Sequence, residues 1–431
     1  AGYLRPADGL VSYGDGPGVD RGGINWNGVC YRVMGTKLVQ INSIGGLTVL
    51  GDVGAGGQCT LDYSFDRLGI SSGGRLYYWD GATLTQVTDP DLGTVVDFAW
   101  IDGYFMTTDG TNIVVTELLD PTAVDPLKYG SSEVDPDPVL GILKLQDEAY
   151  AGNRYTIEVF NNVGGATFPF QRIDGAQIEK GWVGTYTACV FGDSIAFMGG
   201  GRNEAIGVYI GQHSQSQKIS TREIDQIIGQ FSELQLSLCI LEQKVDKGHQ
   251  TLLIHLPDRT LAYDAAASIV LKTPVWYCLT STLAGFERYQ AQNLVWCYDK
   301  WLIGDPTSDR YGYLIDTAST HYGDDVRWEF GTTIVYNEGR GAIFHELELV
   351  ALTGRVALGD NPTISTSYSV DGETWSQPRP ISAGTQGQRN KRLAWLQMGY
   401  MRNWRIQRFQ GTSQANLAFA RLEARLEPLA A

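Results

Sequence analysis

One stretch of the sequence has the spacing of a hydrolase nucleophile. Gly69-Ile70-Ser71-Ser72-Gly73 matches the G-x-S-x-G string, in which the serine occupies a sharp turn from a strand into a helix. Here the glycines stand between two strand-like runs, which predicts a strand, a turn and a second strand. We therefore expect that Ser71 is not a nucleophile.

A second stretch, residues 369–375 (Ser-Val-Asp-Gly-Glu-Thr-Trp), resembles the Asp-box of sialidase-type propellers. It is one residue shorter between Asp371 and Trp375 than that pattern. Asp-Gly pairs favour tight hairpin turns, and a tryptophan can pack beneath such a turn. We interpret the stretch as a hairpin turn and not as a glycosidase element.

Metal ligands and acid–base pairs do not form a recognisable pattern. No histidine has a zinc-binding spacing, no cysteine pair forms C-x-x-C, and the carboxylates are too dispersed to single out a glycosidase pair. The glycine-rich residues 51–57 lack the Lys-Ser/Thr of a phosphate-binding loop. We expect no catalytic residue, no metal and no cofactor. The histidines are His213, His249, His255, His321 and His345, and we expect His255 to be a hydrogen-bonded strand residue.

Cations and tryptophans are interleaved near the C-terminus, and they form the candidate interface. They are Arg389, Lys391, Arg392, Arg402, Arg405 and Arg408 with Trp375, Trp395 and Trp404. Charge and stacking of this kind can contact nucleic acid. The same groups can pair with an acidic neighbouring subunit, with the tryptophans as anchors, or form an ordinary solvated face. We favour an interface or a solvated face over nucleic acid.

A hairpin pattern is repeated along the chain before the candidate interface. The second strand of each hairpin starts near residues 38, 75, 112, 155, 206, 260 and 311, with Asp-Gly or Gly-Gly at several turns. A repeat of about 40–50 residues with several short strands is typical of a β-propeller. The chain is therefore predicted to be all-β, with a propeller of about seven blades over residues 1–325. A capping-box pattern at residues 220–223 predicts a short helical insertion near 220–231.

Longer alternating strands follow, so residues 326–431 are predicted to form an antiparallel β-sandwich. Charge changes at the same place. Residues 326–431 hold 12 Lys and Arg against 9 Asp and Glu, whereas the remainder holds 21 against 39. An acidic body argues against wrapping DNA, because phosphates are bound by cations. It suits a surface that DNA slides past, one that docks on basic partners, or one that only keeps the protein soluble. No apolar run is long enough to span a membrane.

The sequence also resembles the packaged-DNA stabilisation proteins, the tail nozzle or hub of short-tailed phages of the Salmonella lambdoid type. The similar stretches keep their order along the chain, and the run at 252–265 is the most specific of them. They are residues 2–6, 18–22, 29–38, 51–53, 179–186, 224–228, 252–257 with 261–265, 371–372 and 402–408. Family members carry a few dozen residues before the first stretch, so we expect an N-terminal segment to be missing from this sequence.

This resemblance implies a structural phage tail protein, assembled in the host cytoplasm and resident in the virion. It implies a homo-oligomer, a six-fold ring below the portal and its adaptor. That ring would close the DNA exit channel, retain the packaged genome, and anchor a tail needle or plug and tailspikes or fibres. DNA would pass through without sequence-specific binding. The alternatives are a receptor-binding or glycan-degrading phage propeller, an adhesin or depolymerase, and a propeller scaffold of the host cytoplasm.

Overall fold

The computed structural model describes residues 3–118, 120–132, 137–165 and 167–429. Its chain divides into two compact units. One contains residues 13–279 and 288–313, and the other contains residues 1–12, 280–287 and 314–431. Each is described by itself below.

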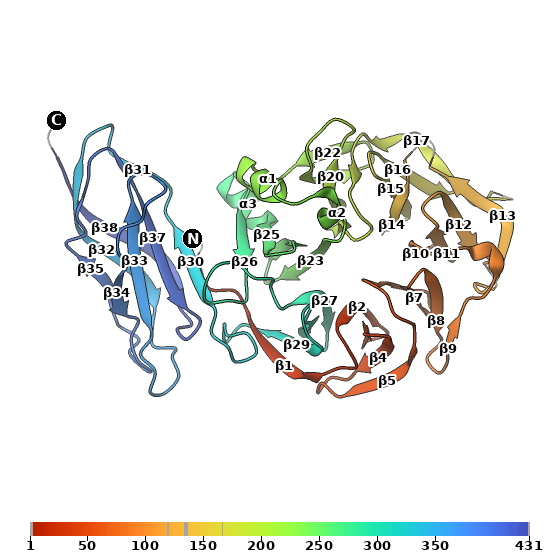
Figure 1. Cartoon of the computed structure of the whole chain (residues 1–431), viewed down its shortest axis with the longest axis horizontal. Helices are drawn as coiled ribbons and strands as arrows, with labels where there is room; N and C mark the ends of the chain where they lie inside the picture. The colour runs from red at the N-terminus through yellow and green to blue at the C-terminus, as the bar shows by residue number, and fades with distance from the viewer. Residues whose placement is uncertain (1–2, 119, 133–136, 166, 430–431) are drawn as a thin grey trace. The chain divides into compact units, whose positions relative to one another are not determined.

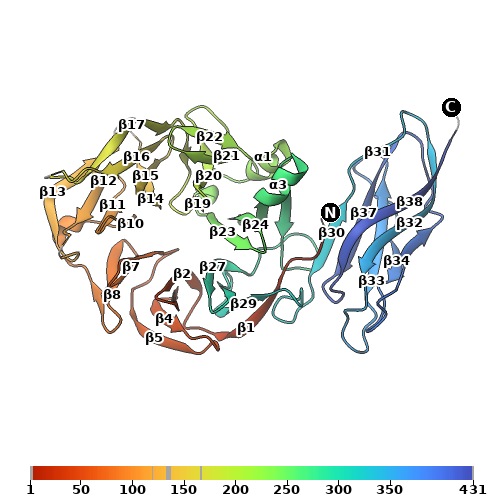
Figure 2. The same cartoon turned by 180° about the vertical axis from the view of Figure 1, so that it is seen from behind.

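In the part of the chain that the structure describes, seven antiparallel sheets, six of four strands and one of five, form the blades of the propeller (Figures 1 and 2). The first three are β2 (Asp20–Trp26), β3 (Val29–Met34), β4 (Lys37–Ile41) and β5 (Leu47–Asp52); β6 (Thr60–Tyr63), β7 (Leu68–Ser72), β8 (Arg75–Trp79) and β9 (Leu84–Gln86); and β10 (Asp97–Ile101), β11 (Tyr104–Thr108), β12 (Asn112–Thr116) and β13 (Val124–Ser131). A 3-10 turn, η1 (Pro90–Leu92), lies between the second and the third.

The next three blades complete most of the ring. They are β14 (Val139–Leu145), β15 (Glu148–Asn153), β16 (Ile157–Asn162) and β17 (Phe170–Ile178); β18 (Gly181–Trp182), β19 (Ala188–Phe191), β20 (Ser194–Gly200), β21 (Gly207–Gln212) and β22 (Gln215–Lys218); and β23 (Ile240–Asp246), β24 (His249–His255), β25 (Thr260–Asp264) and β26 (Trp276–Leu279).

The seventh blade uses both ends of the propeller sequence. Its order is β27 (Gln292–Cys297), β28 (Lys300–Gly304), β29 (Arg310–Ile315) and then β1 (Gly9–Asp15), so the outermost strand comes from the start of the chain. This arrangement ties the last blade to the sequence that leads into the first. The prediction of an all-β chain with about seven blades is confirmed.

Local sequence explains the tight hairpins. Gly73 and Gly74 have φ values of 58° and 77°, and residues with side chains rarely adopt two successive positive angles. The turn joins β7 to β8, and β8 begins at Arg75, where the sequence predicted the second strand of a hairpin. Between neighbouring blades, apolar side chains of the two sheets pack together, for example Val33, Leu68 and Trp79 in one cluster.

Among the described residues, the propeller has three short α-helices: α1 (Arg222–Ile228), α2 (Glu233–Leu236) and α3 (Ala265–Leu271). The first two lie between β22 and β23, in the connection between blades. The expected capping box at residues 220–223 is wrong, because the N-cap of α1 is Thr221 and not Ser220, and the Thr221 side chain makes no cap bond. The capping box is on α2, where Ser232 and Gln235 bond reciprocally.

The second unit contains a β-sandwich of two antiparallel sheets, as predicted. One sheet has the order β30 (Arg327–Gly331), β37 (Trp404–Thr412), β33 (Thr363–Ser369), β34 (Arg379–Ser382), with β31 (Val335–Tyr336) also on β37. In the other, β32 (Ala342–Leu352) pairs with β35 (Leu393–Leu396), β36 (Tyr400–Met401) and β38 (Ala418–Pro428). Residues such as Phe344, Leu349 and Phe409 fill the core between them.

Candidate functional site

The two hydrolase-like strings are structural. Ser71 lies inside β7, 4% exposed, and pairs with Thr60 on one side and Leu76 on the other. Asp371 shapes a turn: its Oδ1 accepts hydrogen bonds from the backbone amides of Glu373 and Thr374, at 2.9 and 2.8 Å. The bond from the Thr374 hydroxyl, followed by these amides, lowers the pKa of the Asp371 carboxyl.

His255 is buried in β24 and hydrogen-bonded on both ring nitrogens. Its Nδ1 lies 3.0 Å from Thr260 Oγ1 and its Nε2 lies 2.6 Å from Glu242 Oε1. This agrees with the role expected from the sequence. Within the described ranges, no group of three or more His, Cys, Asp or Glu side chains could hold a metal ion.

The candidate interface near the C-terminus does not form one surface. Arg405 and Trp395 are buried, with 0% and 2% exposure, so the expectation that they are exposed contact residues is wrong. The physical reason is that both strands alternate, and these two side chains fall on the core-facing side. Trp395 donates from its indole nitrogen to the carbonyl of Arg379 at 2.8 Å.

Arg405 is a buried cation that the sandwich satisfies internally. Its guanidinium donates to the Met398 carbonyl at 2.7 Å and to Gln407 Oε1 at 3.0 and 2.7 Å. It also lies over the rings of Phe344 and Tyr368, at 4.3 and 3.9 Å. Burial lowers the pKa of Arg405 to about 10. The Arg405 guanidinium therefore spends its hydrogen bonds inside the sandwich core and cannot reach a partner.

Two further cations are held by neighbouring residues of the sandwich. Arg392, which directly precedes β35, donates to two carboxylates of β32, to Glu346 at 2.9 Å and to Glu348 at 3.0 Å. The Arg408 guanidinium lies 4.0 Å above the Trp375 ring and donates to Ser367 Oγ at 3.2 Å. Arg389, Lys391 and Arg402 are exposed, and Trp375 and Trp404 are half-buried.

Variants of Arg405 and Arg402 test whether the first cation is part of the sandwich core and the second is only exposed. Arg405→Met is expected to lower the free energy of unfolding of the sandwich by about 2–4 kcal/mol. It leaves two buried acceptors without their hydrogen-bond donor and removes the cation–π contacts. Arg402→Ala, at an exposed position, is expected to change it by no more than about 0.5 kcal/mol. Denaturant unfolding followed by tryptophan fluorescence measures both. Equal losses for the two variants would contradict the assignment.

Carboxylates of the first strands of the blades join one blade to the next. Asp62 of β6 accepts the backbone amide of Trp100 at 2.6 Å, and Asp97 of β10 accepts that of Ile142 at 2.9 Å. Glu242 of β23 accepts the amide of Leu294, next to β27's bulge, at 2.7 Å. These acidic side chains therefore satisfy backbone donors between neighbouring sheets.

The first and seventh blades meet at a buried ion pair. Arg32 on β3 donates to both oxygens of Asp20 on β2, at 2.7 and 2.8 Å, and to the carbonyl of Asn293 on β27 at 3.0 Å. The Asn293 amide donates to Asp20 at 2.6 Å. A Cβ at Gly304 of β28 would lie 2.1 Å from Asp20 Cγ, so only glycine leaves room for this carboxylate.

A second buried arginine organises the glycine-rich loop at residues 51–57. Arg21 donates to the carbonyls of Gly57, Gly35 and Gly54 at 2.6, 2.7 and 2.8 Å, and to Ser72 Oγ at 2.8 Å. The loop thus presents its carbonyls to a cation. A phosphate-binding loop would present amide N–H groups to an anion, so this arrangement is the opposite of one.

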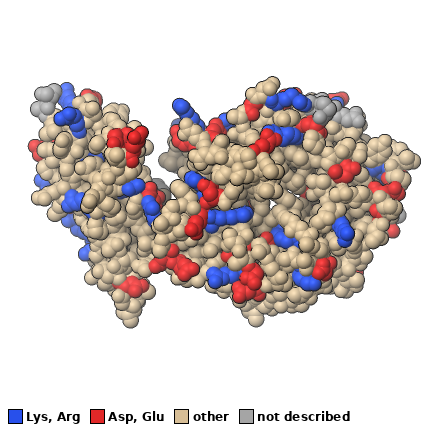
Figure 3. Space-filling model, viewed as in Figure 1, with Lys and Arg blue, Asp and Glu red and all other residues tan. Residues whose placement is uncertain are grey.

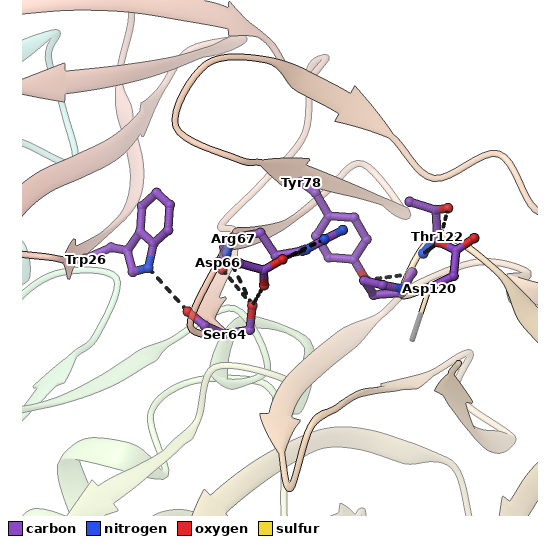
Figure 4. A network of polar contacts seen from close by, with 8 residues as sticks. Trp26, Ser64, Asp66, Arg67, Tyr78, Asp120 and Thr122 are labelled. Atoms are coloured by element: carbon purple, nitrogen blue, oxygen red, sulfur yellow. Dashed lines mark hydrogen bonds and ion pairs between the residues drawn. The ribbon is translucent and has the colours of Figure 1, made fainter. Parts of the chain in front are cut away.

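Another polar network links β2, the β6–β7 turn and the segment before β13 (Figure 4). The Trp26 indole donates to the Ser64 carbonyl at 3.3 Å, and Ser64 Oγ donates to Asp66 at 2.7 Å. The hydrogen bond from Arg67 lowers the pKa of Asp66 to about 2. The same Arg67 lies 5.6 Å from the ring centre of Tyr78.

Sequence reasoning missed Asp20, Arg21, Arg32 and Asp97. For Arg32 and Asp97, the available signal was a charged residue between two apolar ones, but such positions are also common at surfaces. On the propeller face shown in Figure 3, acidic and basic side chains are interspersed. The net negative charge is therefore not gathered on that face into one acidic field.

Comparison with known proteins shows the family. Residues 1–319 match the family model described as the β-propeller of bacteriophage P22 Gp10, and residues 327–427 match the one described as its β-sandwich. The chain belongs to the bacteriophage P22 Gp10 family. The resemblance noted in the sequence is thereby confirmed.

One relative is the tail hub protein gp10 of Salmonella phage P22, which is 27% identical over 423 residues. The match covers 93% of this chain and 86% of the relative. Among solved structures, the WD40 domain of Neurospora crassa Pan2 has a TM-score of 0.44 at 8% identity, covering 72% of this chain and 95% of that one. PorZ of Porphyromonas gingivalis has a TM-score of 0.41 at 10% identity, with coverage of 87% and 46%.

None of the helices in the described ranges is both long and apolar enough to cross a membrane.

Proposed function

We propose that this chain is a structural, non-enzymatic subunit of a phage tail hub, resident in the virion tail. The observation that carries the proposal is the match to both domains of the P22 Gp10 family, in order and over nearly the whole chain. The relative that is named a tail hub protein aligns over 93% of the chain, so the likeness extends well beyond a shared propeller.

In its finer form, the proposal is a ring of six copies below the portal and adaptor, with DNA passing through it. The ring retains the packaged genome and anchors a tail needle and tailspikes or fibres. Head-to-tail contacts around a closed rotation build such a ring. A propeller at 1–325 and a sandwich at 326–431 are the two bodies that would supply the contacts.

The geometry of the propeller favours this role over a glycan-degrading enzyme. Such an enzyme needs a pair of open carboxylates facing a substrate. Asp62, Asp97 and Glu242 instead bind backbone amides of the next blade. An adhesin or depolymerase is the rival, and activity on host polysaccharide would support it.

Exposed cations of the sandwich are the proposed contact residues between subunits or rings. Arg389, Lys391 and Arg402 remain accessible, and Trp375 and Trp404 are half-buried. Replacing these three cations by glutamate is expected to leave the sandwich folded, because no core contact changes. It is expected to reduce the amount of this subunit in purified particles about tenfold or more, since like charges at an interface cost several kcal/mol. Normal incorporation would exclude these three cations as contact residues.

Image averaging of intact particles with the subunit labelled tests the hub proposal itself. A six-fold ring on the tail axis below the portal is the expected result. Density on peripheral spikes, or none in the particle, would contradict it. A matched particle with the label on a head protein controls for misassigned density.

A further inference from the structure

The last strand of the sandwich has one free edge. β38 pairs with β32 through most of its length, with Leu422 opposite Leu349 and Leu426 opposite Phe344. On its other side, the backbone bonds found among the described residues are those between Leu4 and Phe419. Every residue from 420 to 428 is exposed. An edge of this kind is a template for another strand.

The sequence along this edge is complementary to itself when reversed. Residues 421–427 read Arg-Leu-Glu-Ala-Arg-Leu-Glu. If a second copy runs antiparallel and Ala424 faces Ala424, each arginine faces a glutamate. Arg421 then faces Glu427, and Glu423 faces Arg425. Leu422 faces Leu426.

Side-chain alternation sorts these pairs onto two faces. Leu422, Ala424 and Leu426 share the face on which β32 contributes core residues, yet Leu422 and Leu426 remain 36% and 41% exposed. The four charged side chains lie on the opposite face. Directly opposed residues of antiparallel strands have Cβ atoms about 5 Å apart, which is close enough for both the leucine and the ion pairs.

The ion pairs that these charged side chains form within one chain are weak, so they compete little with pairs to a second copy. Arg421 pairs with Glu423 of the same strand, and Glu427 lies 2.8 Å from His345. The Arg421 and Glu427 side chains are 70% and 61% exposed, so water screens both contacts.

We propose that residues 421–427 form a self-association site, at which β38 pairs antiparallel with the same strand of a second copy of this chain. The two sheets then continue as one. Pro428 ends the pairing because it has no backbone N–H to donate. At the other end, the register of β38 shifts opposite Val350 and Ala351. The contact is two-fold, unlike the head-to-tail contacts of a closed ring, so it belongs to the free subunit and goes beyond the hub proposal.

Two charge variants of the full chain test the site. Glu423→Arg/Glu427→Arg makes the charged face all basic, and Arg421→Glu/Arg425→Glu makes it all acidic. Each alone sets like charges against each other at all four positions, so self-association is expected to weaken about tenfold or more relative to the unmodified chain. Mixed in equal amounts, the two variants are expected to form a heterodimer. Sedimentation equilibrium over a range of concentrations measures the self-association of the unmodified chain, of each variant alone and of their mixture.

Hydrogen exchange locates the contact. Backbone amides in 421–427 are expected to gain protection when the two variants are mixed, while the paired strand β37 serves as the internal control. Circular dichroism checks that each variant is folded. An unmodified chain that stays monomeric at every concentration would overturn the proposal. So would variants that each dimerise alone as the unmodified chain does. None of these outcomes bears on the presence of the chain in a particle ring, which tests the hub proposal separately.

Discussion

Arg32→Met is expected to lower the free energy of unfolding of the propeller by about 3–5 kcal/mol, because it leaves the Asp20 carboxylate buried without its partner. Both side chains are at most 1% exposed, so water cannot replace the lost bonds. The site also joins the first and seventh blades through Asn293, so the loss falls where the ring of blades closes. Urea unfolding of the full chain, followed by circular dichroism, measures the change.

A double variant separates the lost ion pair from lost packing. Arg32→Met/Asp20→Asn removes both charges and keeps an amide oxygen for the Asn293 donor. It is expected to recover most of the stability, since a buried pair often contributes little more than neutral groups of the same shape. If the double variant is as unstable as Arg32→Met alone, the loss does not come from the unpaired charge of Asp20.

The second large effect concerns pH. Burial raises the pKa of the Asp97 carboxyl to about 7, against the bonds from Thr60 and the Ile142 amide that lower it. A carboxyl in the unfolded chain has a pKa of about 3.9. From about pH 4 upward the unfolded chain loses this proton while the folded one retains it, so stability falls as pH rises through 7. The difference corresponds to about 4 kcal/mol.

Asp97→Asn is therefore expected to stabilise the propeller at pH 8, by up to about 4 kcal/mol, and to have little effect at pH 4. The amide keeps the shape of the carboxyl: its oxygen can accept from Ile142 and its nitrogen can donate to Thr60. Urea midpoints between pH 4 and 8 for both proteins measure the difference. Asp193→Asn, in an exposed turn, is the matched control. Parallel pH profiles for Asp97→Asn and the unmodified chain would show that Asp97 does not carry this dependence.

Much of the architecture could be predicted from local pattern. Gly73-Gly74 at positive φ sets the hairpin of β7 and β8 at the expected residues, and similar turns repeat through the blades. The short sandwich strands β30 and β34 were not predicted. The use of β1 in the seventh blade could not be predicted either, because it joins strands some 300 residues apart.

The candidate interface was the weakest prediction. Arg389 and Lys391 are exposed as expected, whereas Arg405 and Trp395 are buried. A strand's alternation shows which residues share a face, but not which face looks inward when both carry polar and aromatic side chains. The domain bounds and the contact role of the exposed cations stay predictions.

By itself, the sequence determined the class of fold and, through its resemblance, the family, because turn chemistry and strand period are local properties written in adjacent residues. Only the tertiary structure decided what the charges do. Arg32 and Asp20 meet Asn293 across 261 and 273 residues, and Arg405 finds its acceptors inside the sandwich. Whether a charge is solvated or buried depends on which distant strands pack over it, and that is fixed only when the sheets close.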